Sequence, residues 1–159
     1  MAIKAKKKTY TADGLQFKTK ALLDFYIELK QLKEKKFITD FSLPTVDEQS
    51  RSKYNARKCI IDGNTFDSIM EGKFYIHLKK EKEKGNVIDI ALQPQFELQE
   101  KFSKNGKTIR AITYKADFLV TYKDGSKVVY DVKGMETADF LLKKKLFDYK
   151  YRDLKLVCV

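Results

Sequence analysis

An internal repeat restricts the possible folds of this chain more than any other feature. Residues 13–30 and 62–79 align at a constant offset of 49, with eight identities in eighteen positions. Chance would give about one or two identities over such a length, so we infer that a supersecondary unit is duplicated. The identical pairs are Asp13/Asp62, Gly14/Gly63, Phe17/Phe66, Phe25/Phe74, Tyr26/Tyr75, Ile27/Ile76, Leu29/Leu78 and Lys30/Lys79.

Each copy predicts a short β-like segment with an Asp-Gly turn, followed by an amphipathic helix, which spans roughly 18–36 in the first copy. In the second helix Glu71 lies in the middle, flanked by apolar residues. Gly72 lowers helix stability by about 1 kcal/mol relative to alanine, which predicts the close approach of another element. The apolar stripe of this helix is expected to consist of Phe66, Met70, Phe74, Ile76 and Leu78.

From residue 93 onward the sequence alternates between apolar and polar residues, as β-strands do. Turns at Asn105-Gly106 and Asp124-Gly125 predict an antiparallel three-stranded meander. A helix over 137–149 and a buried strand over 154–159 follow. The expected fold class is therefore α/β (α+β), with a polar linker at 42–54 between a domain over 1–50 and a domain over 51–159.

Composition excludes several classes of protein. One histidine and two distant cysteines exclude most zinc sites and a disulfide framework. No apolar run approaches the roughly 20 residues that cross a bilayer, so we expect a soluble cytoplasmic protein without a membrane partner. The net charge of +11 favours a polyanionic partner, and residues 51–159 hold 23 of the 33 basic residues.

The register of the hairpin around Asp124-Gly125 decides where two aspartates lie. A two-residue loop would place Asp117 and Asp131 on opposite faces of the sheet. A three-residue loop, Lys123-Asp124-Gly125, would place them side by side, and it also gathers the apolar residues on the other face. The hydrophobic pattern therefore favours the register that pairs the two carboxylates.

Two facing carboxylates repel each other, and a divalent cation would turn this repulsion into attraction. Hard oxygen ligands suit Mg²⁺ or Mn²⁺. Lys133, two residues after Asp131, is placed to hold an attacking water or to neutralise charge on a phosphate. On the hairpin alone, two solvated aspartates and a surface lysine are the simpler interpretation. An ordinary exposed position is likewise the simpler interpretation of Glu71 alone.

Together, Glu71, Asp117 and the triplet Asp131-Val132-Lys133 resemble the PD-(D/E)XK nuclease superfamily. The order helix, three-stranded meander, helix, strand is similar to the common core of that superfamily. Five segments also resemble a family of small phage-encoded endonucleases, long catalogued only as a domain of unknown function: KYNARK (53–58), FDSIMEGKFY (66–75), IALQPQFELQ (90–99), ITYKADFLV (112–120) and YDVKGMET (130–137).

This resemblance implies a restriction-endonuclease-like core and Mg²⁺- or Mn²⁺-dependent hydrolysis of DNA in a bacterial host cell. Asp117, Asp131 and the Val132 carbonyl would bind the metal, Glu71 would complete its shell, and Lys133 would position or activate the water. Relatives in the superfamily resolve Holliday junctions as dimers, so branched DNA and a homodimer are expected by analogy. Gln93 would orient the site, or simply begin a strand.

The first repeat has Leu22 where the second has Glu71, so it is expected to lack an active site of its own. It would act as a stabilising cap, or in dimerisation or clamping of DNA. The basic residues expected to contact DNA are Lys7, Lys8, Lys144 and Lys145. Two alternatives remain open: a non-catalytic DNA-binding protein that keeps the nuclease fold, and a protein-binding scaffold or inhibitor.

Overall fold

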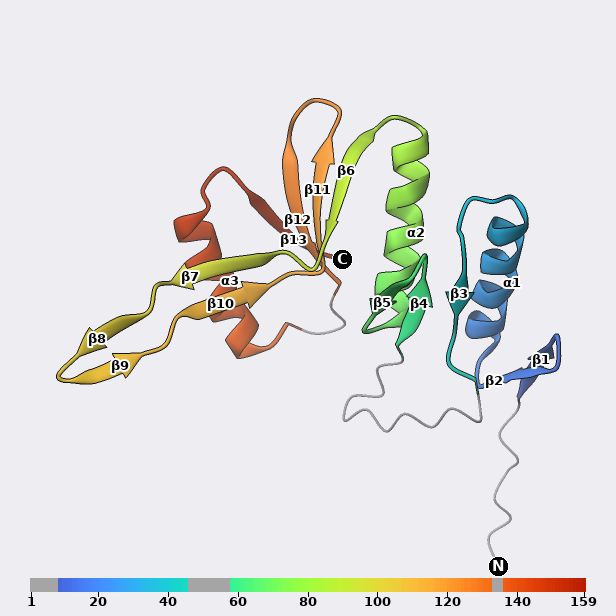
Figure 1. Ribbon diagram of the computed structural model, residues 1–159, viewed down its shortest axis with the longest axis horizontal. Helices are drawn as coiled ribbons and strands as arrows, with labels where there is room; N and C mark the ends of the chain where they lie inside the picture. Colours follow the sequence, from blue (N-terminus) through green and yellow to red (C-terminus); the bar gives the residue numbers. More distant parts are fainter. Residues whose placement is uncertain (1–8, 46–57, 133–135) are drawn as a thin grey trace, which may run out of the picture. The chain divides into compact units, whose positions relative to one another are not determined.

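In the computed structural model, which describes residues 9–45, 58–132 and 136–159, both copies of the repeat form a hairpin followed by a helix (Figure 1). Each element of the second copy begins 49 residues after its counterpart, so the predicted duplication is confirmed. The first copy consists of β1 (Tyr10–Ala12), β2 (Leu15–Phe17) and α1 (Lys20–Glu34), and the second of β4 (Cys59–Ile61), β5 (Asn64–Phe66) and α2 (Ile69–Glu83).

The chain divides into two units by its internal contacts, Met1–Lys73 and Phe74–Val159, and each is described here by itself. The division falls within α2, so the first turn of this helix belongs to the N-terminal unit. The predicted domain boundary between residues 50 and 51 lies outside the described residues.

The N-terminal unit has a core of α1 side chains and residues from the two hairpins. Leu22, Phe25 and Leu29 of α1 are buried, as the helical spacing predicts. The second hairpin joins β3 (Phe41–Ser42) in a three-stranded sheet of order β3-β4-β5. A β-carbon on Gly72 would lie 2.6 Å from Sγ of Cys59, so the predicted close approach to this glycine is confirmed.

The C-terminal unit contains a four-stranded sheet of order β13-β12-β11-β6. In this sheet β12 and β13 pair in parallel. Its strands are β6 (Val87–Leu92), β11 (Phe118–Tyr122), β12 (Lys127–Asp131) and β13 (Lys155–Cys158). Helix α3 (Ala138–Lys150) begins at its cap Thr137, which confirms the helix predicted over 137–149.

The two faces of this sheet are covered by different helices. Phe74 of α2 packs on Phe118 and Tyr130, whose side chains share one face. Val129 points to the opposite face, because successive side chains of a strand alternate. It lies there in a cluster with α3 and the neighbouring strands: Phe96, Leu98, Tyr114, Ala116, Phe140, Phe147 and Leu156.

The three strands predicted from residue 93 onward do not form one meander. Residues 112–122 form two strands, β10 (Ile112–Lys115) and β11, and the sheet begins with β6, which the sequence pattern did not predict. β10 pairs with β7 (Gln95–Gln99) in a separate ribbon. The break has a physical cause in two facing segments of the chain: Gln93 has a φ of +51°, Pro94 follows it, and the Pro94 carbonyl accepts a hydrogen bond from the Ala116 amide.

Beyond β7 and β10 the same hairpin continues as β8 (Phe102–Lys104) and β9 (Lys107–Ile109), joined by the predicted Asn105-Gly106 turn. Both turn residues have positive φ, as a two-residue hairpin turn of this type requires. Across the described residues the fold is a mixed α+β arrangement of three helices and several small sheets. No helix among them is long and apolar enough to cross a membrane.

Candidate functional site

The turn between β11 and β12 fixes the register of the two strands that hold Asp117 and Asp131. The Tyr122 amide donates to the Ser126 carbonyl across the three-residue loop, and Gly125 has a φ of +84°. The pairing then runs from Thr121 opposite Lys127 to Phe118 opposite Tyr130. This is the register that the hydrophobic pattern predicted as far as Phe118, and the Asp117 amide then donates to the carbonyl of the same Tyr130.

Asp117 lies at the break between β10 and β11 and is held by three backbone contacts. Its Oδ2 accepts a hydrogen bond of 2.7 Å from the Val132 amide. Its own amide donates to the Tyr130 carbonyl, and its carbonyl accepts from the Gln93 amide. The main chain of Gln93 therefore supports Asp117. From the sequence alone, Gln93 would either orient the site or simply begin a strand.

Asp131 is buried, with an exposed fraction of 2%. It shares a face of β12 with Val129, which packs in the cluster with α3, so a solvated position for Asp131 is excluded. The Tyr114 hydroxyl donates a short hydrogen bond to Oδ2 of Asp131. Burial is the largest cause that raises the pKa of Tyr114. The hydrogen bond and the charge of Asp131 raise this pKa further, and Cys158 and Asp117 make smaller contributions.

Asp117, Asp131 and Tyr114 form what we call the aspartate cluster. Of these three, Tyr114 is the residue that the sequence analysis does not predict. It precedes Asp117 by three positions, and the alternation of a continuous strand would place it on the opposite face. The break at Ala116-Asp117 removes that alternation and brings its hydroxyl to Asp131. The available signal was the tyrosine itself, because the hydroxyl of a buried tyrosine usually has a hydrogen-bond partner.

The next strand of the sheet, β13, adds a thiol, and an ion pair between Glu136 and Lys144 of α3 acts on it. Cys158 pairs with Asp131 across β12 and β13. Burial raises the pKa of the Cys158 thiol, a hydrogen bond with Glu136 adds to this, and the Lys144 charge opposes it. Lys144 Nζ lies 3.7 Å from Glu136 Oε1, and its charge acts on Cys158, the strand neighbour of Asp131, whereas Lys145 is exposed on α3.

Glu71 is buried, with an exposed fraction of 7%, but it lies in the first turn of α2 and not in its middle. The Ser68 hydroxyl accepts a hydrogen bond from the Glu71 amide, and Glu71 Oε2 accepts one of 2.9 Å from the Asp67 amide. This reciprocal pattern is close to a capping box. Because the helix begins so late, Phe66 belongs to β5, and Met70 is 54% exposed, so neither lies in the predicted helical stripe.

The sequence-predicted residues fall into three groups. Asp117, Asp131 and Val132 come together in the C-terminal unit, while Glu71 belongs to the N-terminal unit. Lys7, Lys8 and Lys133 lie outside the described residues. Within residues 9–45, 58–132 and 136–159, no group of three or more His, Cys, Asp or Glu side chains is placed to hold a metal ion.

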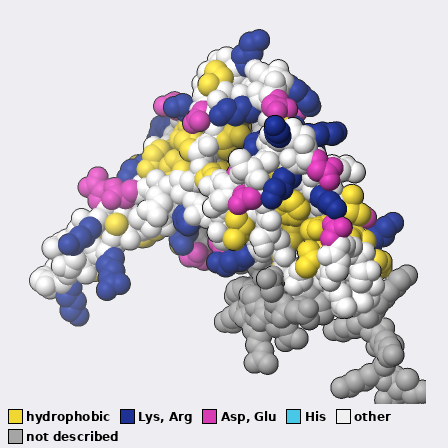
Figure 2. All heavy atoms as spheres, turned by 45° about the vertical axis from the view of Figure 1, so that its right-hand side comes forward, with side chains coloured by type: hydrophobic (Ala, Val, Ile, Leu, Met, Phe, Trp, Pro, Cys, Tyr) yellow, Lys and Arg dark blue, Asp and Glu magenta, His cyan; other side chains and the backbone are white. Residues whose placement is uncertain are grey.

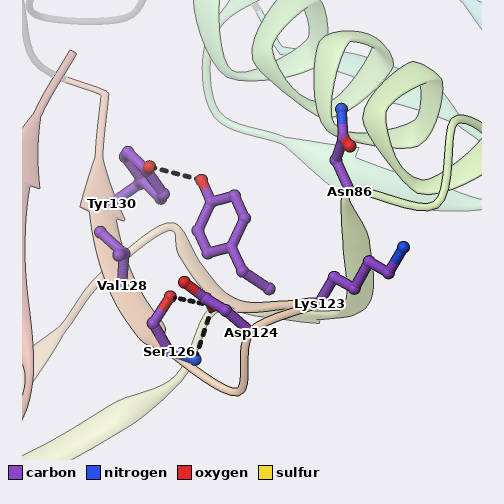
Figure 3. Close-up of a pocket in the computed structure, with 7 residues that line it drawn as sticks. Asn86, Lys123, Asp124, Ser126, Val128 and Tyr130 are labelled. Atoms are coloured by element: carbon purple, nitrogen blue, oxygen red, sulfur yellow. Dashed lines mark hydrogen bonds between the residues drawn. The ribbon is translucent and has the colours of Figure 1, made fainter.

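A shallow pocket of about 460 Å³ lies at the other end of β11 and β12 (Figure 3). It is lined by residues of the turn and the adjacent strand ends, and the hydroxyls of Tyr122 and Tyr130 lie 2.6 Å apart beside it. None of the predicted site residues lines this pocket. It is therefore separate from the aspartate cluster.

Residues 51–159 match the family described as "Protein of unknown function (DUF1064)". This chain belongs to the DUF1064 family. The match covers the second repeat, the four-stranded sheet and the aspartate cluster, and the first repeat lies outside it. The sequence has no significant match among curated proteins or solved structures.

Proposed function

We propose that this DUF1064 protein is a metal-dependent DNA endonuclease of the PD-(D/E)XK type. The observation that supports it best is that Asp117, just before β11, is hydrogen-bonded to the Tyr130 carbonyl and the Val132 amide on either side of Asp131 in the chain. Further support comes from the elements α2, β6, β11, β12, α3 and β13, which follow one another in the order helix, three strands, helix, strand, with the hairpin β7–β10 inserted between β6 and β11.

The donor chemistry of the pair fits Mg²⁺ or Mn²⁺, since carboxylate oxygens are the ligands that these hard cations prefer. A bound cation would supply charge neutralisation for the two aspartates and Lewis-acid activation of the phosphate or water. Asp117, oriented by the Val132 amide, and Asp131, oriented by the Tyr114 hydroxyl, would hold it together with the Val132 carbonyl.

The resemblance implies that Glu71 would contribute a further carboxylate and that Lys133 would position the attacking water. Glu71 would then have two roles, because its Oε2 already accepts a hydrogen bond at the start of α2. Branched DNA such as a Holliday junction is the proposed substrate, a homodimer is the proposed active form, and phage DNA processing in the bacterial cytoplasm is the proposed setting. These finer points rest on the resemblance.

One set of observations favours a second candidate, a DNA-binding protein that keeps the fold without catalysis. Glu71 and Asp131 both accept hydrogen bonds from neighbouring residues, so their burial has an explanation in folding alone. On this view the aspartate pair would be a structural element and DNA would bind without being cut.

A cleavage panel separates the two candidates. Linear, flapped, forked and four-way DNA are incubated with the protein in Mg²⁺, in Mn²⁺ and in EDTA. The nuclease proposal expects metal-dependent cutting of at least one substrate and its loss in Lys133→Ala, with unchanged DNA binding. Lys127→Ala, on the exposed part of β12, is the matched control and should cut normally. Binding without cutting of any substrate would favour the second candidate.

A further inference from the structure

The β8–β9 ribbon (Phe102–Lys104 and Lys107–Ile109) is the most exposed regular structure of the C-terminal unit. Every residue from Lys101 to Arg110 is exposed. The ribbon extends from the β7–β10 pair as the end of a long hairpin (Figure 1). An isolated two-stranded ribbon is marginally stable in water, so a projecting one is unusual without a partner.

The base of this hairpin is fixed to the body of the unit. Phe96 and Leu98 of β7 are buried in the cluster with α3. Lys150 forms an ion pair of 3.4 Å with Glu97, and the Tyr151 hydroxyl donates to the Glu97 carbonyl. The ribbon is therefore held at one end by the core and exposed at the other.

The pairing of the strands sorts the side chains of the ribbon onto two faces. Phe102 pairs with Ile109 and Lys104 pairs with Lys107, and all four side chains share one face. Ser103 and Thr108 form the other face. One face thus combines two lysines with an apolar pair that is 43% exposed at Phe102 and 39% exposed at Ile109.

The ribbon has an excess of positive charge. Lys104 and Lys107 lie directly opposite each other, an arrangement that destabilises a sheet. Lys101 and Arg110 add two further positive charges, and Glu100 is the acidic residue in 100–110. None of these four basic side chains forms an ion pair with a described residue. Figure 2 shows dark-blue basic side chains along this projecting arm, at its left.

We propose that the β8–β9 ribbon docks duplex DNA by entering a groove with its Lys104/Lys107 face. A two-stranded ribbon fits the major groove of B-DNA, and the lysines next to the turn would contact phosphates on either side. The Phe102/Ile109 pair would lie against sugars and base edges. This inference deepens the proposed function, because it names the surface that recognises the same substrate, and it rests on that function for the identity of the polyanion.

The test measures binding of a fluorescent 30-base-pair duplex by anisotropy in EDTA, so that cleavage plays no part. Lys104→Gln/Lys107→Gln is compared with Lys82→Gln/Lys127→Gln, which removes the same charge from exposed positions on α2 and β12. We expect the ribbon variant to bind about tenfold more weakly than the wild type. The magnitude of its slope of log K against log[salt] should be smaller by about 2. The control pair should change both quantities less. Phe102→Ala should weaken binding without changing the slope.

The outcomes separate this inference from the nuclease proposal. If the wild type binds duplex and the ribbon variant does not, the inference stands even when no DNA is cut in Mg²⁺. Equal affinity and salt slope for the wild type and the ribbon variant would overturn it. The inference would also be overturned if the ribbon variant differed from the wild type in oligomeric state, measured by light scattering, but bound DNA with the same affinity. The ribbon would then be a contact between copies of the chain.

Discussion

The Val132 amide donates a hydrogen bond of 2.7 Å to Oδ2 of Asp117, and this contact ties the end of β12 to the start of β11 at the aspartate pair. It orients one carboxylate from the backbone, so the orientation does not depend on a flexible side chain. The second carboxylate, Asp131, is oriented by the Tyr114 hydroxyl. The pair is therefore preorganised by its own unit of the fold.

Replacing Asp117 with asparagine should raise the melting temperature in EDTA. The substitution removes like-charge repulsion worth roughly 0.2–1 kcal/mol, and the amide oxygen can still accept from Val132. The same variant should lose any stabilisation that Mg²⁺ gives the wild type. Thermal unfolding with and without Mg²⁺ measures both effects. Asp89→Asn, on the exposed part of β6, is the control and should leave the Mg²⁺ response intact; an intact response in Asp117→Asn would exclude Asp117 as a ligand.

Removing the Tyr114 hydroxyl should destabilise the protein near neutral pH. Tyr114→Phe leaves the buried Asp131 carboxylate without its phenol donor, and a hydrogen bond to a charged group contributes about 1.5–3 kcal/mol. Urea unfolding measures the loss. Tyr149→Phe, at an exposed position on α3, should change the free energy of unfolding by less than about 0.5 kcal/mol.

The contribution of Tyr114 should also depend on pH. The fold raises its pKa above the ordinary value of 10.0, so the folded state binds this proton more tightly than the unfolded state does. The resulting stability is complete below pH 10 and is lost as the pH rises above it, since the unfolded chain then releases the proton. The difference in unfolding free energy between the wild type and Tyr114→Phe should therefore narrow between pH 10 and pH 11. A constant difference would mean that the phenol is not coupled to Asp131.

Two substitutions of Glu71 should separate its structural role from a role in catalysis. Glu71→Gln keeps an acceptor for the Asp67 amide, so its melting temperature should stay close to that of the wild type. Glu71→Leu, which copies Leu22 of the first repeat, removes that acceptor and should cost about 1 kcal/mol. Both variants should lose metal-dependent cleavage. Full cleavage by Glu71→Gln would assign Glu71 to helix capping alone.

Gly72→Ala tests the close packing in the N-terminal unit. The added methyl group would lie 2.6 Å from Cys59 Sγ, and overpacking typically costs about 1–3 kcal/mol, against about 1 kcal/mol gained in helix propensity. We expect net destabilisation in urea unfolding. In a Cys59→Ala background the same substitution should be much less harmful. Additive effects in the double variant would contradict the contact.

The parts of the fold that the sequence predicts correctly are those set by local rules. The repeat appears as identical residues at a fixed offset, and the Lys123-Asp124-Gly125 loop follows from the alternation of the flanking strands and a glycine with positive φ. The buried stripe of α1 follows from helical spacing. Each of these needs no knowledge of distant contacts.

The parts that sequence reasoning missed depend on long-range pairing. β6 follows α2 directly, and its role in the sheet is clear only from its pairing with β11. The break at Ala116-Asp117 is set by Gln93-Pro94 on the opposite strand, more than twenty residues earlier. Tyr114 reaches Asp131 only because of that break. Ser68, three residues before Glu71, is the sequence signal for its capping role, but the predicted helical stripe begins at Phe66, before the helix does.

The central claim is that the aspartate pair binds the metal that cuts DNA, and the most direct measurement is the single-turnover cleavage rate of Asp131→Asn in Mg²⁺. Asparagine preserves the volume of the buried side chain, and a DNA-binding assay in EDTA confirms that the variant is folded. We predict a loss of at least 100-fold relative to the wild type and to Asp89→Asn, roughly the effect of removing one key electrostatic group from a catalytic site. Cleavage by Asp131→Asn at the wild-type rate would contradict the assignment.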